Sequence, residues 1–311
     1  MPAPPPNPAT PSALHEILRH FGLRPRRAFS QNFLIDPRVA GRIATAVGAG
    51  PDDRVVEIGA GLGAITLPLA RLAGQVIAIE RDPRLAQALG WVLAQHGLNA
   101  PVLRRVVVVV ADVLRLPLDP LLSLPRGAPG RAFLAGNLPY GITSDLLLLL
   151  AASSGWQRGV VMVQEEVADR LTAAPGSEAY GSLTVALRAR CRIGRLFEVS
   201  RRSFFPAPDV DSAVLEIAPL ATRPGPEDSR ALEEVLRAAF GQRRKRLKNA
   251  LRTLRARSPR GRGGDGELNA DEVEALLAAA GVDGSLRAEA LGVEDFLRLA
   301  AAWRRHRAAT R

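Results

Sequence analysis

Val55-Val56-Glu57-Ile58-Gly59-Ala60-Gly61-Leu62-Gly63 is the stretch that decides the fold of this 311-residue chain. Its first four residues are typical of a short strand, and the glycines that follow form a turn that brings the backbone close to a ligand. Apolar residues at helical spacing come next, at Ile65, Leu69 and Leu72. A strand, a glycine-rich turn and a helix in this order predict an α/β fold.

A second apolar strand, over residues 75–79, ends in Glu80. A carboxylate roughly 20 positions after Gly59 is placed to bind the hydroxyls of a ribose. These two features alone leave two interpretations open. Nicotinamide enzymes share the layout, and the glycines could be packing turns.

Two further strands help to choose between these interpretations of the glycine turn and Glu80. Val106 to Val110 consists of five valines and predicts a buried parallel strand, which ends at Asp112. Residues 132–134 predict a fourth strand, which leads into Gly136-Asn137-Leu138-Pro139-Tyr140. Because the carboxyl ends of parallel strands meet at one edge of a sheet, these segments are expected to converge on one crevice. A dinucleotide dehydrogenase would not need the last of them.

The segment Asn137-Leu138-Pro139-Tyr140 suits the methylation of a planar amino group. The lone pair of an adenine amine is delocalised into the ring, so a site must accept both N–H groups while the nitrogen pyramidalises. Asn137 and the carbonyl of Leu138 could be those acceptors. Pro139 fixes the turn, and Tyr140 offers a ring on which an extruded base can stack. The alternative is an ordinary polar turn after a strand.

From about Leu14 to Leu299 the chain resembles the adenine N6-dimethyltransferases of ribosomal RNA, and most closely their bacterial small-subunit branch. Four more blocks carry the resemblance, in the family's order: 30–36 (Ser-Gln-Asn-Phe-Leu-Ile-Asp), 163–171, 204–212 and 239–249. Ala60 departs from a proline common in the family, and Arg81 from an apolar or acidic residue. Neither is expected to carry chemistry.

The resemblance implies a Rossmann-like, S-adenosylmethionine-dependent methyltransferase sheet with a small C-terminal all-helical domain. The residues that it implies for the methyl donor lie in five blocks: Asn32 and Leu34 at the methionine end, Gly59 and Gly61, Glu80 at the ribose, Asp112 at the adenine, and Asn137 between donor and target. Those that it implies for the target base and the chemistry are Asn137, Leu138, Tyr140 and Phe204. Phe204 would stack on the target adenine opposite Tyr140.

Plainer interpretations of the outlying blocks stay open. Asn32 and Phe33 could belong to an ordinary loop before a helix near Pro37, and residues 204–206 could be a hydrophobic plug at a strand edge. The acidic residues of 165–169 are interpreted as the solvated start of a helix rather than as a catalytic cluster. No general base is expected, because methyl transfer from a sulfonium is an in-line displacement with a good leaving group. The four histidines all lie outside the motifs.

A net charge of +11 favours a polyanionic partner, although the abundance of Arg, Ala, Gly and Pro also fits a GC-rich genome. The distribution is more specific, since Arg243 to Arg262 holds ten Lys or Arg and no acidic residue. Such a stripe can release counterions from phosphates and so anchor RNA, or it can be a solvated helix face. The candidate RNA-binding residues are Arg243, Arg244, Lys245, Arg246 and Lys248.

Three parts are expected along the chain: a disordered tail at 1–12, a catalytic domain at 13–220 and a helical RNA-binding domain at 227–311, after a linker at Pro219 to Pro226. Helices are predicted over 232–240, 273–280 and 293–305, and a mobile loop over 258–266. Asn269 and Glu272 predict a capping box for the second helix, which Gly281 ends. The helical domain is expected to form one wall of a cleft over the strand ends.

Cys191 is the single cysteine, which excludes an intrachain disulfide and a cysteine-cluster metal site, and no metal is expected. Without a secretory signal or a long apolar run, the protein is expected to be cytoplasmic and monomeric. The predicted reaction is N6,N6-dimethylation of two adjacent adenosines near the 3′ end of 16S rRNA, within an immature 30S subunit. Three alternatives remain: a resistance-type methylase of large-subunit rRNA, a non-catalytic ribosome-assembly factor, and a nicotinamide oxidoreductase.

Overall fold

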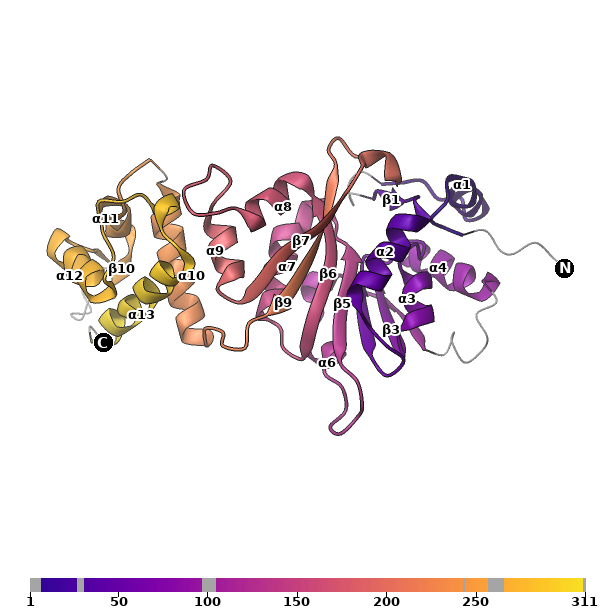
Figure 1. Ribbon diagram of the computed structural model, residues 1–311, viewed down its shortest axis with the longest axis horizontal. Helices are drawn as coiled ribbons and strands as arrows, with labels where there is room; N and C mark the ends of the chain where they lie inside the picture. Colours follow the sequence, from indigo (N-terminus) through magenta and orange to yellow (C-terminus); the bar gives the residue numbers. More distant parts are fainter. Residues whose placement is uncertain (1–6, 27–30, 97–104, 243, 257–265, 310–311) are drawn as a thin grey trace. The chain divides into compact units, whose positions relative to one another are not determined.

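The computed structural model describes residues 7–26, 31–96, 105–242, 244–256 and 266–309 (Figure 1). The chain forms two compact units. The first comprises Met1–Ala168 and Ile193–Pro219, and the second comprises Asp169–Arg192 and Leu220–Arg311. The sequence suggested a single boundary at 219–226 and did not anticipate that 169–192 joins the second unit. It does so because Tyr180 and Val185 belong to the apolar core of that unit.

A seven-stranded sheet organises the first unit, in the order β4-β3-β2-β5-β6-β9-β7. Its strands are β2 (Arg54–Ile58), β3 (Gln75–Glu80), β4 (Val106–Val110), β5 (Ala132–Asn137), β6 (Trp156–Gln164), β7 (Cys191–Val199) and β9 (Ser212–Pro219). The pairs from β4 to β6 are parallel, and β9 runs antiparallel to β6. The four predicted strands and the α/β class are therefore confirmed, and β2 lies between β3 and β5 in the sheet.

One face of the sheet is covered by helices from the N-terminal half of the chain: α1 (Pro11–His20), α2 (Pro37–Val47), α3 (Thr66–Leu72) and α4 (Pro83–Gln95). Val55 pairs in register with Val76 and Phe133, so these side chains share that face, and they form one core cluster with the apolar residues of α2 and α3. The Asp36 side chain accepts from the Arg38 N–H and thereby caps α2 at its first turn.

Strand β4 is parallel as predicted, but the expectation that it is buried is wrong. Val107 is 43% exposed and Val110 is 55% exposed. The reason is its place in the sheet, because among the described strands β4 is outermost and pairs with β3 alone. Five valines specify an extended chain, whereas burial depends on which neighbours the topology supplies.

The expected disorder of residues 1–12 is also wrong for residues 7–12, while 1–6 lie outside the described residues. The Asn7 side chain accepts from the Ala9 N–H, and the Thr10 N–H donates to the Asn7 carbonyl. Ala9 is fully buried in the core cluster of α2 and α3, and α1 begins at Pro11. A few well-placed contacts outweigh a composition that favours disorder.

Shorter elements complete the first unit. They are β1 (Phe33–Leu34), η2 (Val113–Arg115), α6 (Asp119–Leu122), η3 (Tyr140–Ile142), α7 (Thr143–Ala152), α8 (Glu165–Thr172), η4 (Arg201–Ser203) and β8 (Phe204–Phe205), with α8 continuing into the second unit. Strands β1 and β8 pair antiparallel, with Phe33 opposite Phe205 and Leu34 opposite Phe204. This pairing brings two distant sequence blocks, 30–36 and 204–212, side by side.

In its described residues the second unit is helical apart from one short strand pair. Its elements are α9 (Ser182–Arg188), α10 (Pro226–Gly241), α11 (Leu247–Ala250), η5 (Leu251–Thr253), β10 (Arg255–Ala256), β11 (Gly266–Glu267), α12 (Ala270–Ala280), η6 (Ala288–Ala290) and α13 (Val293–Ala309). The predicted capping box of α12 is confirmed, since Asn269 accepts from the Glu272 N–H and Glu272 accepts from the Asn269 N–H. Phe296 and Trp303 are fully buried in its core.

The loop predicted over 258–266 falls almost entirely outside the described residues. Across the parts of the chain that the structure describes, no helix combines the length and the apolar character needed to cross a bilayer.

Candidate active site

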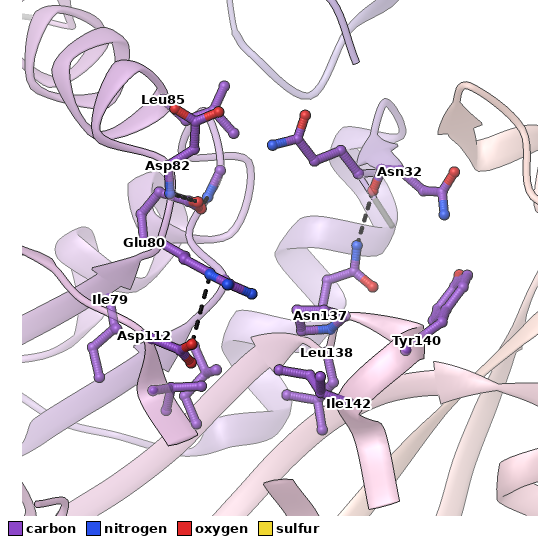
Figure 2. A pocket seen from close by; sticks show the side chains of 18 of the residues that line it. Asn32, Ile79, Glu80, Asp82, Leu85, Asp112, Asn137, Leu138, Tyr140 and Ile142 are labelled. Carbon is purple, nitrogen blue, oxygen red and sulfur yellow. Dashed lines mark hydrogen bonds and ion pairs between the residues drawn. The ribbon is translucent and has the colours of Figure 1, made fainter. Parts of the chain in front are cut away.

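A cavity of about 270 Å³ lies at the carboxyl ends of the central strands (Figure 2). In this view Glu80, Asp82 and Asp112 stand on one side of it, and Asn137 and Tyr140 stand on the other. Eight of the residues implicated by the sequence line it: Asn32, Gly59, Gly61, Glu80, Asp112, Asn137, Leu138 and Tyr140. The expectation that the four strand ends converge on one crevice is confirmed.

The glycine turn after β2 keeps the floor of this cavity open. Gly59 and Gly61 have φ values of 74° and 56°, a backbone conformation that favours glycine. A Cβ on Gly59 would lie 3.2 Å from the Asn137 carbonyl oxygen and 3.8 Å from Pro139 Cδ. Side chains at these positions would fill the space in which a ligand could meet the backbone.

Glu80 is held rigidly at the end of β3. Its Oε2 accepts from the Gly61 N–H at 2.9 Å, and its Oε1 accepts from the Asp82 N–H at 2.8 Å. Burial raises the pKa of Glu80, and these backbone hydrogen bonds oppose the shift only in part. Each carboxylate oxygen has a second lone pair, so an oriented acceptor remains for the hydroxyls of a ribose.

Asp112 follows β4 and caps a short helical turn, since its Oδ1 accepts from the Leu114 N–H at 3.2 Å. Its Oδ2 lies 3.6 Å from Nε of Arg81, which also lines the cavity. No chemical role was expected for Arg81 from the sequence. Its position directly after Glu80, at a strand end that bears a site residue, was the available signal.

Asn137 is the last residue of β5 and carries the clearest sign of a missing partner. Its Nδ2 donates to the Asn32 carbonyl at 3.1 Å, which fixes the orientation of the amide. Its Oδ1 is buried and has no hydrogen-bond partner among the described residues. Because orphaned buried acceptors are costly, this oxygen is suited to an N–H donor supplied by a ligand.

The turn after Asn137 is anchored to its neighbours. The Leu138 N–H donates to the Met162 carbonyl of β6, and the Thr143 hydroxyl donates to the Pro139 carbonyl. The Tyr140 hydroxyl lies 2.9 Å from the Ser212 hydroxyl. Burial raises the pKa of Tyr140, so the phenol stays neutral at physiological pH. The cavity therefore has an aromatic wall beside an open amide acceptor.

Two residues implicated by the sequence do not line this cavity. Phe204 is only 3% exposed and packs in the core cluster of α2 and α3, because its pairing with Leu34 turns it into the protein interior. In this structure it offers no face to a base opposite Tyr140. Leu34 lines a smaller adjoining cavity of about 40 Å³, which shares Asn32, Gly59 and Asn137 with the larger one.

Glu57 is a site residue to which the sequence assigned no role. It is 1% exposed, lines the smaller cavity, and its Oε2 has no hydrogen-bond partner among the described residues. Burial, reinforced by the charge of Glu80, raises the pKa of Glu57 to about 8, and the nearby Thr66 hydroxyl opposes this only in part. A lone carboxyl within an apolar strand was the signal that could have identified it.

The acidic residues after β6 begin α8, as expected. Glu165 forms an ion pair with Arg195 and lines neither of the two cavities described above. Of the histidines, His15 packs edge-on against Phe205, and His20 stacks on Trp91 with ring centroids 4.9 Å apart. Neither ring belongs to the lining of the main cavity, whose polar side chains are amides, carboxylates, one phenol and the guanidinium of Arg81.

Residues 22–262 match the family model described as ribosomal RNA adenine dimethylase. The chain belongs to the ribosomal RNA adenine dimethylase family. It is 41% identical over 302 residues to the ribosomal RNA small subunit methyltransferase A of Pelotomaculum thermopropionicum, a match covering 94% of this chain and 96% of that protein. It is 39% identical over 296 residues to the protein of the same name from Thermobifida fusca, covering 94% of both.

Solved structures of related proteins have the same fold. The 23S rRNA methyltransferase ErmE is 30% identical and aligns with a TM-score of 0.61, covering 87% of this chain and 99% of that one. A dimethyladenosine transferase from Plasmodium falciparum aligns with a TM-score of 0.66 at 24% identity, covering 86% and 95%. This chain is therefore an rRNA adenine dimethyltransferase with a Rossmann-like sheet, and the family to which it belongs uses S-adenosylmethionine.

The second unit carries most of the basic stripe of this dimethylase. Arg243 lies outside the described residues, and so do the three arginines from 257 onward. The six cations of the stripe that the structure describes are all exposed: Arg244, Lys245, Arg246, Lys248, Arg252 and Arg255. None of these six has an ion-pair partner within 4 Å among the described residues.

Three arginines elsewhere in the second unit do form ion pairs. Arg298 pairs with Asp295, Arg304 with Asp228, and Arg307 with Glu234. Within the described part of the stripe, Arg246 interacts at longer range with Asp283, and the remaining positive charge is available to an external anion.

Proposed function

We propose that this enzyme transfers methyl groups from S-adenosylmethionine to N6 of two adjacent adenosines near the 3′ end of small-subunit rRNA. The substrate would be an immature 30S subunit, and the enzyme would act as a cytoplasmic monomer. The observation that carries the proposal is the buried, unpartnered Oδ1 of Asn137, a residue that lines the same cavity as the Tyr140 ring and the carboxylates of Glu80 and Asp112. The amino group of an adenine is a donor that such an acceptor can bind.

The residues of the cavity fit the methyl donor. Glu80, with both oxygens already oriented by backbone N–H groups, would bind the ribose, and Asp112 would accept from the adenine amine. The open glycine turn at Gly59 leaves room for the part of the methyl donor that lies between these two residues. Asn32, Leu34 and the smaller cavity would hold the methionine end. When bound, S-adenosylmethionine supplies an electrophilic methyl group on a sulfonium.

Asn137 and the Leu138 carbonyl would hold the target amine. Both are acceptors, so together they can take the two N–H groups and favour a pyramidal nitrogen whose lone pair points away from the ring. These hydrogen bonds strengthen as the nitrogen acquires positive charge, so they stabilise the transition state more than the ground state. No side chain has to remove the proton, which can leave to water after the methyl transfer.

Tyr140 would stack on the extruded base, because its ring lines the cavity beside Asn137. Phe204 is proposed as the second stacking residue only in a rearranged state, since here it is buried in the core. The exposed cations of the second unit would bind the phosphates of the RNA. Single-stranded RNA suits both features, because its bases can be splayed out onto aromatic rings.

Assignment to the small subunit is supported by the relatives, whose name is ribosomal RNA small subunit methyltransferase A. The similarity to ErmE, a 23S rRNA methyltransferase, keeps a large-subunit substrate as the second candidate. A non-catalytic assembly factor is disfavoured by the intact acceptors Glu80, Asp112 and Asn137. A nicotinamide oxidoreductase does not need an unpartnered amide oxygen beside an aromatic ring.

The test is to incubate the purified enzyme with radiolabelled S-adenosylmethionine and either unmethylated 30S subunits or 50S subunits, and then to digest the RNA. Label in N6,N6-dimethyladenosine from the 30S sample supports the proposal. Label only in the 50S sample would replace it with the large-subunit alternative. Binding of 30S subunits without label, by protein that still binds S-adenosylhomocysteine, would refute the catalytic role.

A further inference from the structure

Ser212 is a fully buried polar residue outside the main cavity whose hydroxyl reaches the wall of that cavity. It is 0% exposed, it opens β9, and its hydroxyl lies 2.9 Å from the Tyr140 hydroxyl. Ser212 does not line the cavity, whereas Tyr140 does. The serine therefore contacts the site only through the tyrosine.

The hydrogen bond spans the end of one strand. Tyr140 follows β5 and Ser212 begins β9, and β6 lies between these two strands in the sheet. Ser212 stands opposite Gln164 in the register of β6 and β9, so its backbone position is fixed by the ladder. A hydroxyl at a fixed point of the sheet is a suitable anchor for a side chain that emerges from a turn.

A hydrogen bond to the tyrosine hydroxyl holds the far end of the ring in place and so restrains χ1, whereas rotation of the ring about its own Cβ–Cγ axis is set by packing. The other end of the same turn is restrained as well, through the Leu138 N–H to the Met162 carbonyl. The ring of Tyr140 and the amide of Asn137 are then held relative to each other by a common frame, which consists of β5, β6 and β9. Preorganised groups need no rearrangement in the transition state.

We propose that Ser212 is a positioning residue that holds the Tyr140 ring in the place required for stacking on the target base. The inference rests on the proposed function, because it assumes that Tyr140 stacks on that base. Ser212 does not touch substrate, and its effect on turnover passes entirely through the tyrosine hydroxyl.

A double-mutant cycle tests this dependence. Ser212→Ala removes the anchor, and Tyr140→Phe keeps the ring but removes the hydroxyl that is anchored. Each single change is expected to lower kcat on 30S subunits by about three- to tenfold, the range that the loss of one buried hydrogen bond corresponds to. The double variant is expected to be no slower than either single variant, because the two changes remove the same interaction.

Three controls separate positioning from a general loss of structure. Ser212→Thr keeps a hydroxyl and should restore most of the activity. Ser153→Ala removes another buried serine hydroxyl of the first unit, which donates to the Leu149 carbonyl, and should leave kcat unchanged. The Kd for S-adenosylhomocysteine should be unaltered by Ser212→Ala, since neither Glu80 nor Asp112 is disturbed.

A readout without any activity comes from the tyrosine content of the chain. Tyr140 and Tyr180 are the only two tyrosines, so uniformly labelled tyrosine gives two sets of NMR signals. Ser212→Ala should let the χ1 torsion of Tyr140 average over rotamers, seen in its χ1-dependent couplings, and leave the couplings of Tyr180, which is fully buried in the second unit, unchanged. Unchanged Tyr140 couplings would overturn the anchor itself.

The outcomes distinguish this inference from the proposed function. If the wild-type enzyme methylates 30S subunits but the two single losses multiply in the double variant, Ser212 does not act through Tyr140 and the inference fails alone. If the wild-type enzyme binds S-adenosylhomocysteine but methylates neither subunit, the proposed function fails, while the NMR comparison still decides whether Ser212 anchors the ring.

Discussion

Glu57 gives the first unit a pH-dependent stability that one substitution should remove. It is 1% exposed, and burial together with the charge of Glu80 raises its pKa from 4.5 to about 8. A carboxyl whose pKa is raised on folding binds its proton more tightly in the native state than in the unfolded state. Its contribution is therefore most favourable below pH 4.5, declines as the pH rises, and reaches a plateau once the pH passes the native pKa.

The size of this loss of stability follows from the difference between the unfolded and the native pKa of Glu57. Each pH unit between 4.5 and about 8 costs about 1.4 kcal/mol, so the loss is about 3 kcal/mol by pH 7 and about 5 kcal/mol at the plateau. Glu57→Gln keeps the shape of the side chain and cannot ionise. The variant should become more stable relative to wild type as the pH rises, and the difference should level off near pH 8.

Native-state hydrogen exchange of peptides from β2 and β3 measures the unfolding free energy of this unit separately from the second one. The comparison of variant and wild type at each pH cancels the intrinsic exchange chemistry. Asp53→Asn is a matched control. Burial tends to raise the pKa of Asp53, but hydrogen bonds from the Gly50 and Arg131 N–H groups lower it overall. Its stabilisation is lost only as the pH falls below its unfolded pKa of 3.8.

The control difference should consequently be flat between about pH 5.5 and 8.5, whereas the Glu57→Gln difference should rise by about 1.4 kcal/mol per unit up to about pH 8. A Glu57→Gln difference that does not change with pH over this interval would refute the assignment of a protonated, buried carboxyl at this position.

Asn137→Ala should lower kcat by at least about a hundredfold and change the Kd for S-adenosylhomocysteine far less, because the hydrogen bond from the target amine to Asn137 strengthens only as the amine pyramidalises. Single-turnover kinetics measures the first quantity and isothermal titration the second. Equal losses in kcat and in affinity would contradict the prediction. Gly136→Ala should destabilise the first unit by about a few kcal/mol in a thermal melt, since a Cβ would lie 2.4 Å from the Ile58 carbonyl oxygen. The control Gly90→Ala, in α4 with open space around the added Cβ, should be neutral or stabilising in the same measurement. Three exposed cations of the stripe should be changed together to Gln: Arg244, Lys245 and Arg246. This variant should bind rRNA more weakly with a shallower dependence on salt, and it should bind S-adenosylhomocysteine normally; an unaltered salt slope would assign these residues to solubility.

The family and the chemistry of the donor site could be predicted from local sequence. Gly59 and Glu80 follow strands that any α/β fold places at one sheet edge, and the segment from Asn137 to Tyr140 has a composition matched to one task. Such motifs predict a site from local sequence because strand ends in a parallel sheet converge whatever the distance between them along the chain. The capping box of α12 was predictable for the same reason, since its partners are three residues apart.

Other features depended on contacts between distant segments. The exposure of Val107 follows from the outermost place of β4 in the sheet, and the burial of Phe204 follows from its pairing with Leu34. The order in residues 7–12 comes from the burial of Ala9 in a core built by later helices. None of these three features can be predicted from a local sequence pattern.

The sequence by itself determined that this chain is an α/β enzyme of the rRNA adenine dimethylase family, because glycines, carboxylates and the Asn-Leu-Pro-Tyr turn express local backbone and hydrogen-bonding requirements. The tertiary structure alone decided which side chains face the cavity, which carboxyl is buried at Glu57, and that Ser212 reaches Tyr140 across β6. Burial and hydrogen bonding between distant residues depend on strand order and register, and these are fixed only when the whole sheet has assembled.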